Sequence, residues 1–255
     1  MITSGNVSLD YVKVRNGETL SHGGSQLWFP KDGDLKDLSI HTGGCGLIAI
    51  FDFMLWYEER ASQAGKRTFS GPAADVRKTG RIPDRSAYMD GIRALFRRYP
   101  VLPKLGSSSL LLPVYLNLFL LRNHANLRLS FLFRNTKEKR MRILQGSLED
   151  GYPVILSLGA RILPFGKPKG VTFHTYENGR LKPAVTDVRR HFVTVTGIRY
   201  PEDITEPVLL EISSWGRKYY INYEELNAYM TKSSLPWLTG FFYVKRARGK
   251  APFGS

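Results

Sequence analysis

Cys45 is the only cysteine among the 255 residues, and its surroundings suit a nucleophile. It lies in the segment 41–57, HTGGCGLIAIFDFMLWY, between glycines and a long apolar run. The glycines allow a tight turn, and the apolar run predicts a buried helix that begins near the cysteine. At such an N-terminus, backbone amides and the helix dipole favour the thiolate, the reactive form of cysteine. The alternative is a small buried structural residue, so the chemistry depends on a partner elsewhere in the chain.

His191 is the candidate partner of this thiol. It begins the segment 191–197, HFVTVTG, whose alternation of residue types predicts a strand. On that strand the imidazole would share a face with Val193 and Val195, at the edge of the core. The alternative is a core histidine that makes a single hydrogen bond.

A thiol and an imidazole together can carry out acyl transfer. The thiolate attacks a carbonyl carbon, the base keeps the thiol ionised, and hydrogen-bond donors stabilise the oxyanion that develops. The product of this step is an acyl-enzyme. Water as the acceptor makes the protein a hydrolase, whereas an amine or a thiol makes it an acyltransferase with the same residues.

A third motif, EISSWG at residues 211–216, follows the histidine strand. The Gly-Cys-Gly around Cys45, His191 with Gly197 behind it, and Ser-Trp-Gly at 214–216 together resemble the papain-like cysteine peptidases. The likeness is closest to their compact bacterial branch, which includes the bacteriocin-leader-processing peptidases. His191 follows Cys45 by 146 positions (191 − 45), within the range of about 130 to 150 that is typical of papain.

The resemblance implies a role for each matched residue. Cys45 would be the nucleophile, and His191 would be its general base and later its acid. The position that holds an orienting Asn or Asp in the family is Ser213 here, and Trp215 would shield the histidine from water. A serine hydroxyl accepts a hydrogen bond from an imidazole but brings no charge to stabilise imidazolium. The orienting role is therefore weaker, or it has moved to Ser214 or Asp187.

The oxyanion hole departs from the family pattern as well. Six residues before the cysteine, where the family has a glutamine, this chain has Ser39. His41 and Gln26 are the alternatives for that donor. The backbone amide of Cys45 would remain the first donor to the oxyanion.

The order of predicted elements is helices first and antiparallel strands later, which is typical of an α+β fold. Short strands are expected at 7–14 and 26–29, and a mobile surface loop is expected at 65–85. Helices are expected at 45–62, 86–99, 110–124, 137–148 and 224–231. In the helix 86–99 the buried face would be formed by Met89, Ile92, Leu95 and Phe96. Further strands are expected at 127–133, 154–158, 171–176, 191–200, 208–213, 218–221 and 237–245. The whole chain, 1–255, would be a single papain-like domain, with a helical half at about 40–150 and a β-rich half at about 151–248.

Composition limits the partners and the compartment. The formal net charge is +15 and the pI is about 9.9, which favours an acidic substrate or partner. Nucleic acid would also be attracted, but it is not favoured because no aromatic-interleaved basic motif occurs. One cysteine excludes an internal disulfide, and the histidine spacing does not match a zinc site, so no metal and no cofactor are expected. We expect no membrane span, because the run 110–121 is too short and is interrupted, and we expect a cytoplasmic location because no signal peptide is recognised.

The sequence therefore favours a thiol hydrolase, most simply a cysteine peptidase that cleaves a peptide or isopeptide bond through Cys45 and His191. One alternative is a catalytically impaired papain-like protein that binds an acidic partner or nucleic acid through its basic surface. The other alternative is a cysteine-dependent acyltransferase. Asp52, within the apolar run, is expected to be a buried, hydrogen-bonded structural group rather than a catalytic acid.

Overall fold

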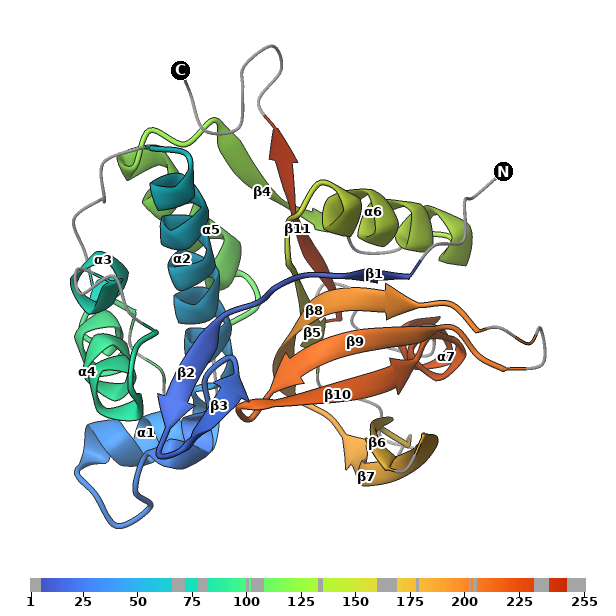
Figure 1. The fold of residues 1–255 in the computed structure, drawn as a ribbon, viewed down its shortest axis with the longest axis horizontal. Helices are drawn as coiled ribbons and strands as arrows, with labels where there is room; N and C mark the ends of the chain where they lie inside the picture. The colour runs from blue at the N-terminus through green and yellow to red at the C-terminus, as the bar shows by residue number, and fades with distance from the viewer. Residues whose placement is uncertain are drawn as a thin grey trace. The chain divides into compact units, whose positions relative to one another are not determined.

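The computed structural model divides into two compact units (Figure 1). The sheet unit comprises Met1–Asp10, Ser130–Ser213 and Lys218–Val244, and the helical unit comprises Tyr11–Leu129, Ser214–Arg217 and Lys245–Ser255. The structure describes residues 6–65, 72–77, 82–99, 101, 108–132, 135–159, 169–177, 179–201, 203, 206–231 and 239–246. Helices and antiparallel strands are both present, which confirms the α+β class. The expectation of a single domain stays a prediction.

The helical unit is built around one long helix. Its elements are β2 (Lys13–Asn16), β3 (Thr19–His22), the short 3-10 helix η1 (Gln26–Trp28), α1 (Leu35–Gly43), α2 (Cys45–Gln63), α3 (Pro72–Arg77), α4 (Arg85–Phe96) and α5 (Leu111–Arg122). Helix α2 contacts α1, α3, α4 and α5. All residues from Cys45 to Glu58 are buried, so α2 is enclosed around its whole circumference, as its uniform hydrophobicity predicts.

Gly44 forms a tight corner between α1 and α2. The two helix axes are bent by 86° at this break. The Gly44 amide donates to the Ile40 carbonyl oxygen at 2.8 Å, and a Cβ atom at Gly44 would lie 2.4 Å from that oxygen. Only glycine fits there without displacing the backbone, so this corner fixes the residue with which α2 begins.

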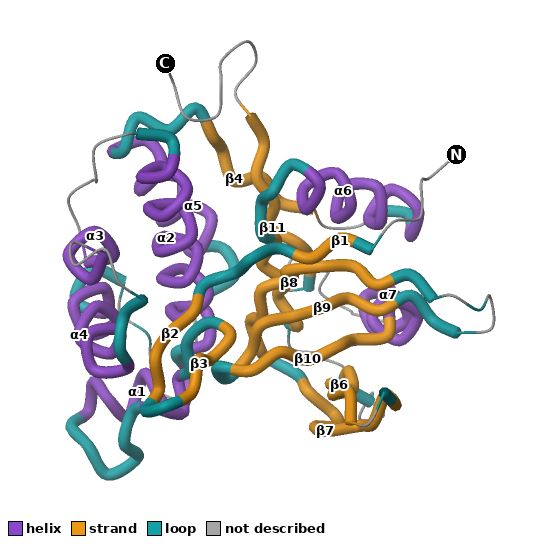
Figure 2. Tube along the Cα trace, in the orientation of Figure 1, coloured by secondary structure: helices purple, strands orange, loops and turns teal. Residues whose placement is uncertain are grey.

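The described residues of the sheet unit form antiparallel strands and the helices α6 and α7 (Figure 2). The strand order is β4-β11-β5-β8-β9-β10-β6-β7, and β1 (Val7–Ser8) pairs with β8. The other bounds are β4 (Leu127–Leu132), α6 (Lys137–Glu149), β5 (Val154–Leu158), β6 (Val171–Glu177), β7 (Arg180–Val188), β8 (His191–Arg199), β9 (Leu209–Ser214), β10 (Arg217–Asn222), α7 (Tyr223–Thr231) and β11 (Gly240–Arg246). Helix α6 packs against β1, β5 and β8, and α7 packs against β6.

Several sequence-based expectations were wrong in detail. Residues 26–28 form a 3-10 helix rather than a strand, because Ser25 caps the amide of Leu27. Helix α3 lies within the expected loop 65–85; the remainder of that loop is only partly described. In α4 the buried side is Tyr88, Gly91, Ile92 and Leu95, whereas Met89 and Phe96 are only half-buried.

Two further corrections concern β7 and α5. Strand β7 was not expected, since it is largely exposed and contains Pro183. It lies at the edge of the sheet, where a proline leaves no ladder bond unmade. Helix α5 was expected to be buried, but only Leu112, Leu116 and Leu120 are. No single helix among the described residues is long and apolar enough to cross a membrane, and the one pair that reaches the length is bent, α1 with α2.

Candidate active site

Cys45 is the first residue of α2 and is 8% exposed. The N-cap residue is Gly44, which has no side chain to accept from the amides of the first turn. The amides of this turn have no acceptor within the helix itself, and the positive end of the helix dipole lies there. Both features favour a negative charge on the Cys45 sulfur or on an oxyanion beside it.

Ser39 is a poor donor for that oxyanion. Its side chain lies one turn before the end of α1, is buried, and donates to the carbonyl oxygen of Leu35 at 2.6 Å. An oxyanion would have to replace this short hydrogen bond. The remaining candidate donors are the backbone amide of Cys45, the side chain of Gln26 in η1 and the side chain of His41 in α1.

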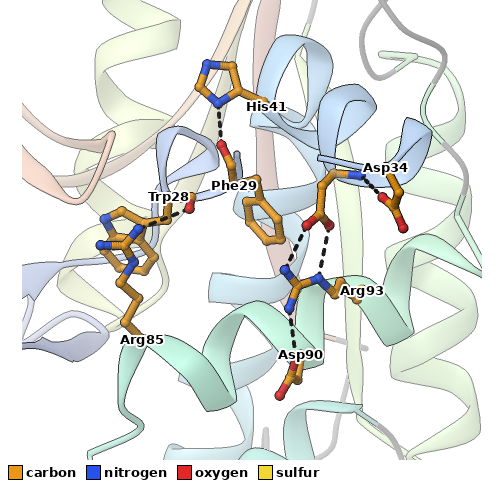
Figure 3. A network of polar contacts seen from close by, with 8 residues as sticks. Trp28, Phe29, Asp34, His41, Arg85, Asp90 and Arg93 are labelled. Atoms are coloured by element: carbon orange, nitrogen blue, oxygen red, sulfur yellow. Dashed lines mark hydrogen bonds and ion pairs between the residues drawn. The ribbon is translucent and has the colours of Figure 1, made fainter. Parts of the chain in front are cut away.

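His41 is turned toward η1 through one ring nitrogen (Figure 3). Its Nδ1 lies 2.6 Å from the carbonyl oxygen of Phe29, so Nδ1 carries the proton. In the neutral ring Nε2 is then an acceptor, and His41 can donate to an oxyanion only as imidazolium. Gln26 is the better donor, because an amide NH₂ keeps a second hydrogen after one bond is made. Its Nε2 donates to the His41 carbonyl oxygen at 2.9 Å.

Asp52 holds the segment before η1 against α2. Its carboxylate accepts from the Tyr88 hydroxyl at 2.6 Å and from the Gly24 amide at 3.0 and 3.2 Å. A Cβ atom at Gly24 would lie 2.0 Å from the Tyr88 hydroxyl oxygen. Burial raises the pKa of Asp52 to about 7, against the hydrogen bonds from Tyr88 and Gly24, which lower it. These bonds match the expectation of a structural carboxylate.

Arg93 connects α1 to α4 (Figure 3). Its guanidinium makes two hydrogen bonds to the Asp37 carboxylate, at 3.0 and 2.8 Å, and one to Asp90 at 2.9 Å. It also lies 5.5 Å from the ring centroid of Phe29. Arg85 acts similarly on Trp28: it donates to the Trp28 carbonyl oxygen at 3.0 Å and stacks on its ring. The two arginines fix η1, and so the backbone that carries Gln26.

Tyr99 is a residue near the thiol that the sequence reasoning missed. It follows α4 and is buried, and its hydroxyl donates to the Ser108 carbonyl oxygen at 3.3 Å. Burial and then the negative charge of the Cys45 thiolate raise the pKa of Tyr99. A lone tyrosine after a helix carries no signal in the sequence that would single it out.

In the sheet unit, His191 begins β8 and is 7% exposed. It pairs with Leu158 of β5, and its ring centroid lies 6.2 Å from that of Phe173. Burial lowers the pKa of His191 to about 3, so the imidazole is neutral at pH 7. A neutral ring can accept a proton, but burial makes the resulting imidazolium costly unless a negative charge lies against it.

The strand register bears on Ser213, one of the two serines expected near this histidine. Thr194 of β8 is paired with Ser213 of β9, and paired residues share a face of the sheet. His191 is three residues from Thr194, so it lies on the opposite face. Ser213 therefore lies on the face of the sheet opposite to that of His191. The register thus speaks against Ser213 as the residue that orients the imidazole.

Asp187, the other alternative, is already bonded. It accepts from the Gly170 amide at 2.5 Å and forms an ion pair with Arg189. The bond with Arg189, followed by the one with Gly170, lowers the pKa of this carboxyl. Its backbone has a positive φ of 60°, as does Arg190, with a φ of 52°. The chain thus enters β8 through two left-handed residues that are not glycine.

Trp215 and Gly216 form a strained turn at the tip of the β9–β10 hairpin. Their φ angles are 49° and 73°, the signs that a type I′ turn requires at both central positions. Such a φ is rare for a bulky side chain, and it persists only where the surroundings hold it. The His22 amide donates to the Gly216 carbonyl oxygen at 3.0 Å, and the Gly216 amide donates to that of Gly24 at 2.8 Å. A shielding role for Trp215 stays a prediction.

The two halves of the expected catalytic pair belong to different units. Cys45 lies in the helical unit, and His191 and Ser213 lie in the sheet unit. The pairing of Cys45 with His191 therefore stays a prediction. Among the described residues no group of three or more His, Cys, Asp or Glu side chains is arranged to hold a metal ion.

Comparisons with protein-family models, with curated proteins and with solved structures found no match. The papain-like resemblance consequently depends on the three motifs alone.

Proposed function

We propose that this protein is a papain-like thiol hydrolase, most simply a cysteine peptidase. The observation that carries the proposal is the position of Cys45, a buried residue that begins the central helix α2. A structural cysteine gains nothing from a helix N-terminus, whereas a nucleophile gains stabilisation of its thiolate. The papain-like fold is part of the same proposal.

In the proposed reaction the Cys45 thiolate attacks the carbonyl carbon of a peptide or isopeptide bond. His191 takes the thiol proton and returns it to the leaving amine, and Ser214 accepts a hydrogen bond from the ring. The Cys45 amide and the Gln26 side chain are the proposed donors to the oxyanion. Water then hydrolyses the acyl-enzyme.

The burial of His191 favours one other candidate function. A histidine whose pKa is lowered to about 3 is a weak base at neutral pH. Ser213, at the position where the family has Asn or Asp, carries no negative charge that would raise the pKa of His191. A catalytically impaired relative that binds an acidic partner through the basic surface is therefore the second proposal. An acyltransferase would use the same residues as the peptidase and would differ only in its acceptor.

A peptide-library digest read by mass spectrometry distinguishes these functions. The proposal predicts cleavage by the wild type, none by Cys45→Ala or His191→Ala, and normal cleavage by His174→Ala, a control on β6. Ser214→Ala should lower the rate more than Ser213→Ala. Cleavage that survives Cys45→Ala would defeat the thiol mechanism. Product that forms only with an added amine would identify an acyltransferase, and absence of any product would favour the binding protein.

A further inference from the structure

Helix α5 presents a stripe of exposed aliphatic side chains. The face that contacts the core is formed by Leu112, Leu116 and Leu120, which are fully buried. The opposite face carries large apolar residues whose exposed fractions range from 45% to 71%: Leu110, Leu111, Val114, Leu118 and Leu121. Their spacing of three and four residues places them on one side of the helix, next to one another. We call these five residues the α5 stripe.

Positive charges flank the α5 stripe and no acidic residue lies on the helix. Arg122 is exposed at its C-terminal end, and Arg98 and Arg122 line a cavity of about 510 Å³ together with Leu118 of the stripe. Burial raises the pKa of Tyr115, and the positive charges of Arg98 and Arg122 both act to lower it. The two charges therefore act at the same place on α5. Glu58 also lines this cavity but is 2% exposed, so its carboxylate does not face the solvent as the arginines do.

Strand β4 begins beside α5 and carries a further exposed arginine. Asn117 exchanges two hydrogen bonds with the backbone of Leu129, at 2.8 and 3.1 Å, which anchors the start of β4 beside α5. The exposed Arg128 precedes Leu129 directly. An apolar surface of five branched side chains therefore has Arg98 and Arg122 at one side, and a further exposed arginine, Arg128, at the start of the neighbouring strand.

This combination selects among the possible occupants. A second copy of the chain would bring two sets of arginines together without an acidic residue on either helix to pair with them. A protein partner would find no polar group within the stripe to fix its orientation. Exposed aliphatic side chains beside arginines match the two components of an anionic lipid surface, its acyl chains and its phosphates.

We propose that the α5 stripe docks on an anionic phospholipid bilayer, with Leu and Val side chains among the acyl chains and Arg98, Arg122 and Arg128 at the headgroup phosphates. The helix lies in the plane of the surface, and the net charge of +15 adds a long-range attraction. This docking is independent of the proposed hydrolase chemistry.

Sedimentation with vesicles tests the proposal on the full chain. We expect binding to vesicles of equal parts phosphatidylglycerol and phosphatidylcholine, and none to phosphatidylcholine alone. Arg98→Gln with Arg122→Gln should weaken binding about thirtyfold at low salt. Leu118→Gln with Leu121→Gln should weaken it about tenfold or more.

Matched controls use exposed residues elsewhere. Leu20→Gln with Leu27→Gln removes two leucines that are each 53% exposed, and Arg180→Gln with Arg217→Gln removes two exposed arginines. Both double variants should bind nearly as the wild type does. Equal loss in controls and test variants, equal binding to neutral vesicles, or no binding at all would overturn the proposal. A dimer in solution that Leu118→Gln with Leu121→Gln disperses would also overturn it and assign the stripe to self-association.

Discussion

Two buried ionisable side chains, Asp52 and His191, respond to pH in opposite senses. The folded-state pKa of Asp52 is raised to about 7, so between about pH 4 and pH 7 the folded protein binds a proton that the unfolded chain has lost. Its contribution to stability is full at low pH and is lost as the pH rises. The pKa of His191 is lowered to about 3, so its contribution is full above about pH 6.5 and is lost as the pH falls.

Single substitutions should expose the two opposing slopes. Asp52→Asn removes the acid-stabilising contribution, so the free energy of unfolding should fall faster on acidification than in the wild type. His191→Gln removes the other contribution, and stability should instead rise on acidification from pH 6.5 to pH 4.5. Each slope should change by up to about 1.4 kcal/mol per pH unit. Urea unfolding at several pH values measures this, and parallel curves for all three proteins would show that neither group is perturbed.

At the scale of the element, the corner at Gly44 decides where α2 begins. Gly44→Ala forces a Cβ atom against the Ile40 carbonyl oxygen, 2.4 Å away, and should lower stability by about 1 to 3 kcal/mol. Gly146→Ala in α6 is the control, because its Cβ would have open space. It should be neutral or stabilising by up to about 1 kcal/mol, from helix propensity alone. Equal effects of the two changes, measured by thermal unfolding, would contradict the corner argument.

The ion pair between α1 and α4 should matter more than an ordinary surface pair. Arg93→Met leaves the Asp37 carboxylate, whose side chain is 10% exposed, without its guanidinium partner, and should cost about 2 kcal/mol. Lys182→Met breaks a pair with Glu177 in which both side chains are more than half exposed, and should cost less than about 1 kcal/mol. Denaturant unfolding compares them, and a cost for Arg93→Met as small as the control would show that α1 and α4 do not depend on this contact.

The elements that the sequence revealed are those with an unambiguous pattern. Helix α2 is apolar on every side and begins after glycines, and β8 alternates with an initial histidine, so both were predicted within a residue or two. Strand β7 was missed because its exposure leaves charged residues on both faces. In α5, composition alone cannot tell a buried leucine from an exposed one. The hydrogen bonds that Asp52 accepts from Gly24 and Tyr88 join residues far apart in the sequence, and no sequence spacing predicts such contacts.

At the scale of the whole molecule, the proposed chemistry needs residues from both units. The nucleophile and the proposed oxyanion donor, Gln26, come from the helical unit, and the base comes from the sheet unit. A charge on the Cys45 sulfur is also what would raise the pKa of His191 from its low value, since an opposite charge within about 4 to 6 Å favours imidazolium. Each group would thus activate the other.

The rate of Cys45 alkylation by iodoacetamide, followed from pH 5 to pH 9, tests this pairing most directly. The wild type should react at pH 6 at least tenfold faster than His191→Gln, in which only the N-terminus of α2 remains to stabilise the thiolate. His174→Gln should behave as the wild type. Identical profiles for the wild type and His191→Gln would contradict the pairing of Cys45 with His191.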